Sequence, residues 1–273
     1  MTEKKHTSAG VEAKLRDALA KADRGEVAHL PFLTPSEQIR VRRALTEAGR
    51  QGQAFFFGGY PSSERACLFL LPEYLLQLLD TPAEETSPDT LEPLLGEALS
   101  DAVCAVRIRG SGYRELTHRD YLGALLGLGL ERDALGDVAV QNSHEAVVFC
   151  SRTVARFLSE HLENVASDRV KVFPYRPDES FTDGRRYQPI HDTVASARLD
   201  CVVAALTNLS RADAQALIRS GSVDVDFEAE ERTDVPLSPP VTLSVRGYGR
   251  FLLRSFDGET RKGRLRLFAE KLI

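Results

Sequence analysis

Residues 197–225 have the sequence ARLDCVVAALTNLSRADAQALIRSGSVDV, and this stretch decides the fold of the C-terminal part of the chain. Apolar residues recur with helical spacing over Ala197–Leu206 and again after Ser210, which is a typical helix N-cap residue. The second helix is predicted to end near Ser220, because Gly221 stands where a left-handed C-cap is common. Two short helices in succession are therefore expected here.

A small sheet is predicted after the two helices. Apolar and polar residues alternate there, as they do in half-buried strands. The alternating stretches are Val223–Phe227, Val241–Val245 and Arg250–Arg254. Helices and sheet together make up a predicted C-terminal domain, residues 190–273.

Arginine stands at the start of both predicted helices. Arg198 opens the first helix, and Arg211 follows the cap residue Ser210 of the second. Guanidinium groups pair with phosphate through two parallel hydrogen bonds, and the unpaired N–H groups of a helix N-terminus also favour phosphate. We therefore predict that these residues hold an RNA backbone, recognised by shape and charge, since no aromatic stacking platform is evident. Three more arginines are expected to widen this site: Arg219, Arg246 and Arg250.

The composition is that of a globular protein with more than one domain. Of 273 residues, 42% are hydrophobic and 27% charged, and the net charge of −5 gives no general sign of nucleic-acid binding. RNA contacts must therefore come from local clusters of arginine. No apolar run approaches the about 18 residues that a membrane span needs, and no secretory signal is evident, so a cytoplasmic protein is expected. Reduced core thiols, and no metal site, are predicted for the four widely spaced cysteines, Cys67, Cys104, Cys150 and Cys201.

Residues 1–95 are predicted to form an N-terminal α/β domain. Helical periodicity covers Val11–Ala22. A second helix is predicted to begin after Thr34, with Pro35 at its first position and Glu37 completing a capping box. The predicted strands are Ala54–Gly58 and Ala66–Leu70.

Residues 97–180 are predicted to form a central domain with the element order β-α-β-β-α-β. This order is the ferredoxin-like pattern, which many RNA-recognition domains share. The aromatic signature of those domains is missing from Ala146–Cys150. The predicted elements are strand Val103–Arg109, helix His118–Leu126, strands Asp137–Gln141 and Ala146–Cys150, helix Ser151–Asn164 and strand Val170–Phe173. The whole chain is therefore expected to be an α+β protein of three small domains.

Three polar segments lie outside these elements. Thr81–Pro93 is predicted to be an exposed linker or an insertion, and Tyr175–His191 a linker, since both contain more than one proline. The basic segment Arg261–Arg266 is interpreted either as a further RNA contact or as an ordinary solvated strand.

The C-terminal motifs resemble the S-four-type RNA-binding domain, named after a ribosomal protein. The shared motifs are Arg198-Leu199-Asp200, Ser210-Arg211, Gly221-x-Val223-x-Val225 and Val245-Arg246-Gly247-x-Gly249-Arg250. The sequence departs from that family at Asp226, where Asn is common, and at Pro239-Pro240, which replace Gly-Asp.

Residues 117–138 resemble the signature of the YlmH family of bacterial RNA-binding proteins, and with the C-terminal motifs this resemblance covers most of the chain. It implies binding to rRNA and tRNA on a large ribosomal subunit that carries obstructed peptidyl-tRNA, in ribosome-associated quality control. It also makes His118, Arg119 and Asp120 a candidate partner surface. We expect a monomeric protein that is not an enzyme and has no catalytic residue, cofactor, metal, membrane partner or small-molecule substrate.

Two other functions stay open. One is an RNA-modifying enzyme whose chemistry lies in the first two domains, near His118, Asp120 or Asp137. The other is an adaptor in cell division that is tethered to RNA. Arg198-Leu199-Asp200 also occurs in pseudouridine synthases, but plain helix core follows it here. Asp200 is therefore interpreted as a first-turn acid favoured by the helix dipole.

Overall fold

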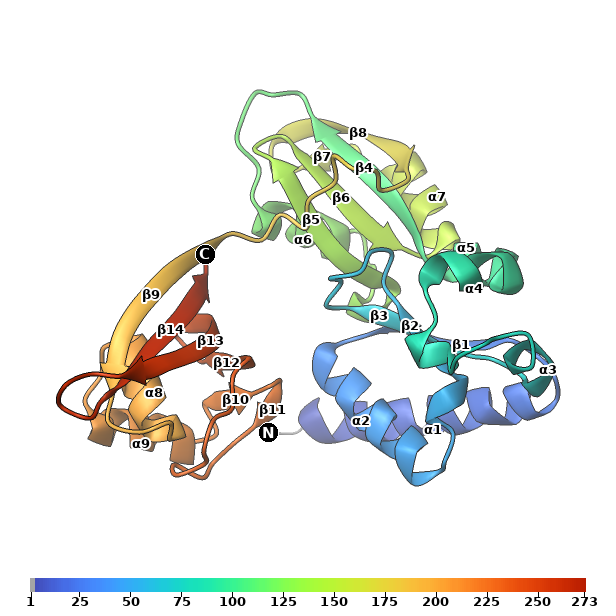
Figure 1. Ribbon diagram of the computed structural model, residues 1–273. Coiled ribbons are helices and arrows are strands. Elements are labelled where there is room, and N and C mark those ends of the chain that lie inside the picture. The colour runs from blue at the N-terminus through green and yellow to red at the C-terminus, as the bar shows by residue number, and fades with distance from the viewer. Residues whose placement is uncertain (1–2) are drawn as a thin grey trace. The chain divides into compact units, whose positions relative to one another are not determined.

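The computed structural model describes residues 3–273, with side chains from Gly10 onward. The chain forms two compact units, residues 1–184 and 185–273, each with helices and its own sheets (Figure 1). The predicted α+β class is confirmed. The finer division at 1–95, 97–180 and 190–273 stays a prediction, with the first two ranges lying together in the first unit.

The first unit begins with a three-stranded antiparallel sheet and two helices. The order in the sheet is β1-β3-β2. The capping box at Thr34 and Glu37 is present and begins α2 as predicted. Strand β1 was not predicted, because Pro31 interrupts its pattern; its register with β3 shifts between Leu30 and Leu33. The elements are α1 (Glu3–Asp23), β1 (Ala28–Leu33), α2 (Pro35–Glu47), η1 (Gln51–Gln53), β2 (Ala54–Phe57) and β3 (Ala66–Leu70).

The predicted linker Thr81–Pro93 is wrong. The segment contains the start of helix α4, which Ser87 caps and which has a proline at its first position. Its proline-rich, polar composition suggested a linker instead. Leu91 and Ala83 are fully buried, so the segment belongs to the core. The short elements here are α3 (Glu73–Leu76), η2 (Ala83–Glu85), α4 (Pro88–Leu95) and α5 (Glu97–Ala102).

A second sheet completes the first unit, with strand order β5-β6-β4-β8-β7. Every neighbouring pair is antiparallel. The predicted order β-α-β-β-α-β is present, with the short β7 added. The elements are β4 (Cys104–Gly110), α6 (His118–Gly127), η3 (Arg132–Ala134), β5 (Leu135–Asn142), β6 (Glu145–Cys150), α7 (Arg152–His161), β7 (Asn164–Val165) and β8 (Asp168–Tyr175).

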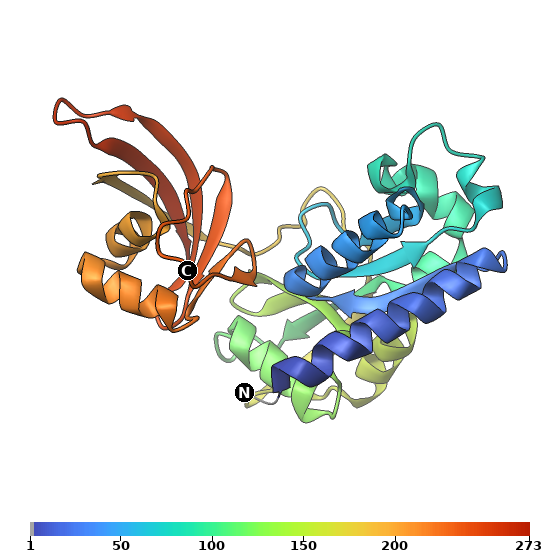
Figure 2. The ribbon, with the colours of Figure 1, turned by 90° about the horizontal axis from the view of Figure 1, so that it is seen from below.

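The two faces of this sheet have different partners. Ile108 and Val148 point to the face covered by α6 and α7, where Tyr121 and Leu158 complete a buried cluster. On the opposite face, Phe149 packs in a core formed largely by residues of the first hundred. In the ribbon, the helices and strands of those residues are drawn in blue and blue-green (Figure 2). The two sheets of this unit therefore share one hydrophobic core.

The second unit is a six-stranded antiparallel sheet with two helices. Its strand order is β11-β10-β12-β13-β14-β9. The predicted linker Tyr175–His191 is wrong at both ends, because its first residue ends β8 and its last five lie in β9. The elements are β9 (Tyr187–Val194), α8 (Leu199–Thr207), α9 (Arg211–Arg219), β10 (Val223–Val225), β11 (Glu228–Ala229), β12 (Val241–Val245), β13 (Gly249–Glu259) and β14 (Leu265–Leu272).

Candidate nucleic-acid interface

Two arginines share one buried carboxylate at the start of helices α8 and α9. Asp200 is 0% exposed, and its Oδ1 accepts a hydrogen bond of 3.2 Å from Nε of Arg198. Its Oδ2 accepts from Nε of Arg211 at 2.9 Å and from Nε2 of Gln215 at 2.7 Å. We call these four residues the Asp200 cluster. The shared carboxylate of Asp200 therefore holds both guanidinium groups near the starts of α8 and α9.

The electrostatics of the cluster favour the charged form of Asp200. Burial alone raises the pKa of this carboxyl, but hydrogen bonds from Arg198, Gln215 and Arg211 outweigh burial and hold it far below its ordinary value. The hydrogen bond to Asp200 also raises the pKa of Arg211. Two arginine side chains and one carboxylate give the cluster a formal sum of one positive charge.

The local fold explains how two helix starts meet. Arg198 is the N-cap residue of α8, and Ser210 caps α9 by accepting a hydrogen bond from the Asp213 N–H, as predicted. Between the helices, Asn208 adopts φ 56°, a left-handed conformation that asparagine tolerates and that ends α8 sharply. The turn brings Arg211 back to the buried side chain of Asp200.

One part of the predicted site is wrong. The first N–H groups of α8 are not available to phosphate, because Leu199 N–H donates to Val235 O at 2.9 Å and Asp200 N–H to Thr233 O at 3.0 Å. Residues 233–235 therefore cover the start of this helix. Phosphate binding at the cluster rests on side chains, not on the amides of these two residues.

The other predicted arginines are not brought into the cluster. Arg219 ends α9, about 12 Å along the helix axis from Arg211 at 1.5 Å per residue. Arg246 follows β12, and its N–H donates to Ser222 O beyond the end of α9. The guanidinium of Arg250 lies 5.3 Å from the centre of the Phe227 ring. An RNA role for these three stays a prediction, at a place separate from the Asp200 cluster.

Sequence reasoning missed the role of Asp200. Its position in the first turn of α8 suggested only a favourable charge next to the helix dipole. The signal was the presence of two arginines around an acid inside an apolar helix, because a buried carboxylate needs partners. Gln215, one turn into α9, gave no sequence signal of its own.

One side chain of the candidate partner surface at the start of α6, that of Asp120, is engaged in capping the helix. Asp120 accepts hydrogen bonds from N–H and Oγ1 of Thr117, at 2.8 and 2.6 Å. These bonds hold the pKa of Asp120 below its ordinary value. His118 and Arg119 are exposed on the same turn. The surface stays a prediction.

Asp137 is a candidate catalytic residue in the enzyme hypothesis, but its carboxylate is engaged in hydrogen bonds that join parts of the fold. Its carboxylate accepts hydrogen bonds from Tyr60 Oη at 2.6 Å and from the N–H groups of Glu64 and Arg65 at 2.7 and 3.1 Å. These contacts hold a loop of the first sheet against the second.

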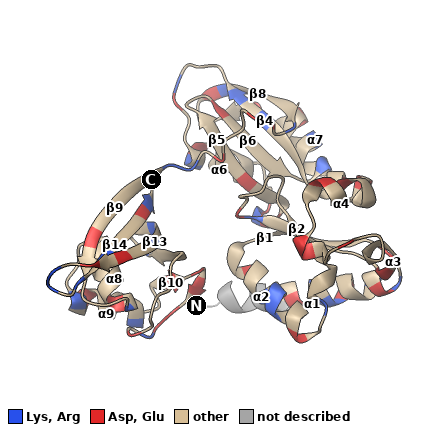
Figure 3. Ribbon diagram, in the orientation of Figure 1, with Lys and Arg blue, Asp and Glu red and all other residues tan. Residues whose placement is uncertain are grey.

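All four cysteines are free thiols, and burial raises the pKa of Cys67 to about 12. Among the side chains that the structure describes, from Gly10 onward, no three of His, Cys, Asp or Glu are grouped to hold a metal ion. Within residues 3–273, no helix is long and apolar enough to cross a bilayer. Acidic and basic residues are interspersed over both units (Figure 3).

Known proteins resemble this chain in a family signature, in sequence and in structure. A family model described as the putative RNA-binding domain in YlmH matches residues 104–178. The chain is 30% identical over 241 residues to the Ribosome-associated protein quality control protein P2 of Bacillus subtilis (strain 168), covering 88% of this chain and 85% of that protein. The solved structure of the Cell division protein ylmH from Streptococcus pneumoniae is 15% identical, with a TM-score of 0.45 over 64% of this chain and 92% of that chain.

Proposed function

The chain belongs to the YlmH family, and we propose that it is a cytoplasmic RNA-binding factor that acts on the ribosome without catalysing a reaction. Its relative in Bacillus subtilis is named for ribosome-associated quality control, and 88% of this chain aligns with it. We propose the large ribosomal subunit with obstructed peptidyl-tRNA as the target, and rRNA and tRNA as the molecules bound. We further propose that residues 190–273 are an S-four-type RNA-binding domain.

The Asp200 cluster is the observation that carries this proposal. The side chains of Arg198 and Arg211 are 40% and 54% exposed, although each has one edge fixed by a carboxylate that is wholly buried. A guanidinium has five N–H donors, so each arginine keeps donors for a second acceptor. Exposed cationic donors in a fixed place suit a phosphate chain, because less side-chain freedom is lost on binding.

Cosedimentation with large ribosomal subunits tests the proposal. The full chain is compared with the double variant Arg198→Ala, Arg211→Ala, which is expected to lose most of its binding. Arg254→Ala is the matched control for a lost positive charge, since Arg254 lies on β13 in an exposed pair with Glu270. Crosslinking and sequencing of the bound RNA then identify which rRNA or tRNA segment is held.

The alanine variant also removes partners from a buried carboxylate, so its folding must be checked. A second variant, Arg198→Lys, Arg211→Lys, keeps both charges but loses the planar fork. If the lysine variant is folded and binds about tenfold more weakly than the wild type, the fork geometry carries binding. Binding equal to that of the wild type in both variants would remove the Asp200 cluster from the proposal.

A further inference from the structure

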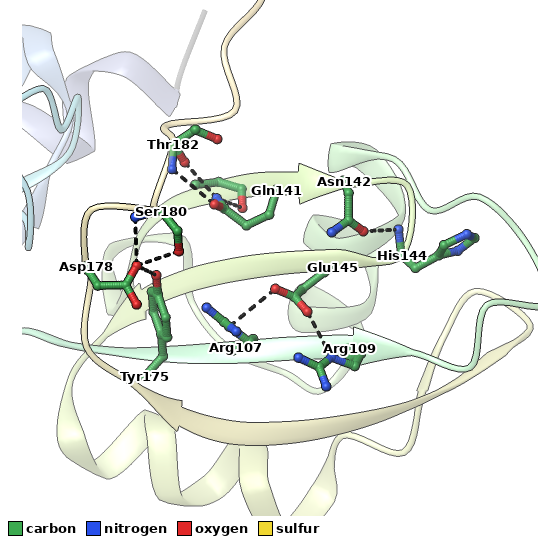
Figure 4. A network of polar contacts seen from close by, with 11 residues as sticks. Arg107, Arg109, Gln141, Asn142, His144, Glu145, Tyr175, Asp178, Ser180 and Thr182 are labelled. Carbon is green, nitrogen blue, oxygen red and sulfur yellow. Dashed lines mark hydrogen bonds and ion pairs between the residues drawn. The ribbon is translucent and has the colours of Figure 1, made fainter.

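The sheet of residues 104–178 has a face on which arginine and aromatic side chains alternate between two strands. Arg107 and Arg109 come from β4, while Phe173 and Tyr175 come from β8. The guanidinium carbon of Arg107 lies 4.2 Å from the centre of the Tyr175 ring, and that of Arg109 lies 5.8 Å from the centre of the Phe173 ring. Figure 4 shows both arginines and Tyr175 on one side of the sheet.

The strand register places a third cation on this face. Arg107 is opposite Phe173, and Arg109 is opposite Lys171. Since side chains alternate along a strand, Lys171 points to the same side as Phe173 and Tyr175. We call Arg107, Arg109, Lys171, Phe173 and Tyr175 the β4–β8 patch.

One acid lies among these cations. Glu145 of β6 forms an ion pair with Nε of Arg107 at 3.3 Å and accepts a hydrogen bond from Nε of Arg109 at 2.9 Å (Figure 4). Nε of Arg107 is buried and makes no hydrogen bond with any residue that the structure describes. Glu145 thus orients two arginines. A second acid, Asp178, borders the patch and its charge also acts on Arg107, so the patch with both acids keeps one positive charge.

Packing explains only part of this face. Toward one end, Ala105, Val147 and Phe149 are buried in the core shared with the first sheet. Beyond them the cover stops, and Phe173 is 41% exposed, one of few large apolar side chains left open on the described surface. An exposed aromatic ring beside cationic side chains is the arrangement that proteins use to bind single-stranded nucleic acid.

A rim of polar residues borders the patch. Gln141, on β5, pairs with the backbone of Thr182 in both directions, at 2.7 and 3.1 Å. Asp178 accepts from Ser180, and Tyr175 Oη donates to the same carboxylate at 3.5 Å (Figure 4). These bonds fix the segment that follows β8 along one side of the face and hold the Tyr175 ring in place.

We propose that the β4–β8 patch binds single-stranded RNA, with a base stacked on Phe173 and phosphates held by Arg109 and Lys171. The inference rests on the proposed function, because the ligand is RNA. It assigns a second site, in the unit of residues 1–184, and a single-stranded form of RNA. Aromatic rings stack on bases of any sequence, and arginine adds both charge and a planar stacking surface. The net positive charge, together with an exposed ring that can stack on a base, suits a single-stranded RNA better than an apolar protein surface.

Fluorescence anisotropy with a 5′-fluorescein-labelled twelve-nucleotide oligouridine tests this inference in the full chain. Phe173→Ala is expected to weaken binding about tenfold, while Phe173→Tyr keeps the ring and binds like the wild type. Lys171→Ala is expected to weaken binding and to lower its salt dependence. Arg156→Ala is the matched control, because Arg156 is exposed on α7, which covers the other face of the sheet.

A hairpin RNA of equal length separates the two sites. Phe173→Ala should leave hairpin binding unchanged, and Arg198→Ala, Arg211→Ala should leave much of the oligouridine binding intact. Oligouridine binding that is unaffected by Phe173→Ala overturns the inference, whether or not the Asp200 cluster binds RNA. Loss of oligouridine binding only in the double arginine variant also overturns it, while supporting the proposed function.

Discussion

The guanidinium of Arg211 lies 2.9 Å from the carboxylate of Asp200, and the arginine is half exposed while the aspartate is wholly buried. The pair therefore joins the interior of the second unit to its surface. Because Arg198 contacts the same carboxylate, a change at Asp200 alters both arginines at once.

Asp200→Asn should weaken RNA binding although it makes the protein more positive. Simple charge attraction predicts the opposite, because one negative charge is removed next to two cations. We expect a loss of about 1–2 kcal/mol, since both arginines must then be ordered on binding. Titration of RNA by anisotropy measures it, with Asp257→Asn on β13 as a control of equal charge change. Tighter binding by Asp200→Asn would show that the cluster does not position the arginines.

The second unit should lose stability in acid because of Asp200. The pKa of this carboxyl is depressed in the folded state, since hydrogen bonds from Arg198, Gln215 and Arg211 outweigh burial. Its contribution is therefore present above the unfolded pKa of about 4 and is lost as the pH falls toward the lower folded value. Urea unfolding is measured from about pH 6 to about pH 2, the range of that titration. The free energy of unfolding is expected to fall over this range, and Asp200→Asn is expected to make the fall smaller. Parallel curves for both proteins would contradict this account.

Salt dependence should report the number of phosphates held at the Asp200 cluster. Each phosphate contact contributes a slope of about 0.7 to 0.9 in a plot of log affinity against log salt. The variant Arg198→Ala, Arg211→Ala is therefore expected to lower the slope by about 1.4 to 1.8 on a hairpin RNA. Arg254→Ala should leave it unchanged, and an unchanged slope in the double variant would mean that neither arginine contacts phosphate.

Arg65→Met should destabilise both sheets of the first unit together. Arg65 is buried and donates to Leu135 O and Phe32 O, each at 2.8 Å, and to Arg132 O at 3.0 Å. Burial lowers its pKa to about 10, so it stays charged at neutral pH. The loss of three hydrogen bonds from a buried, charged donor leads us to expect a loss of about 2–4 kcal/mol.

Hydrogen exchange measures this effect strand by strand. Protection is expected to fall in β3 and in β5 to a similar extent, while Arg16→Met, at an exposed position of α1, changes neither. Loss of protection in only one sheet would instead favour separate domains at residues 1–95 and 97–180.

The sequence predicted elements well where the signal was local. The capping box at Thr34 and the cap at Ser210 depend on residues within one turn, and both helices begin as expected. It failed where partners distant in the chain decide the structure. Strand β9 forms because it pairs with β14, and its polar, proline-containing sequence carries no such information.

The candidate sites show the same division. Arg198 and Arg211 were found from their places at helix starts, which are local features. The patch around Phe173 was missed because the aromatic signature was sought on β6, whereas the rings come from β8 and their arginines from β4. Residues 107 and 173 are far apart in the sequence and are brought together only by the pairing of β4 with β8. No short stretch of sequence therefore contains both.

The pairing of β9 with β14 also bears on the order of folding. It joins Tyr187 to Leu272, so it closes a long loop, whereas α8 and α9 are neighbours in the chain. Loop-closure entropy makes distant strand pairs form late, while helical hairpins form fast. We therefore expect the two arginines to meet their aspartate before the sheet is closed. Mutations along the closing strands would then change how quickly this unit opens more than how it grips a ligand.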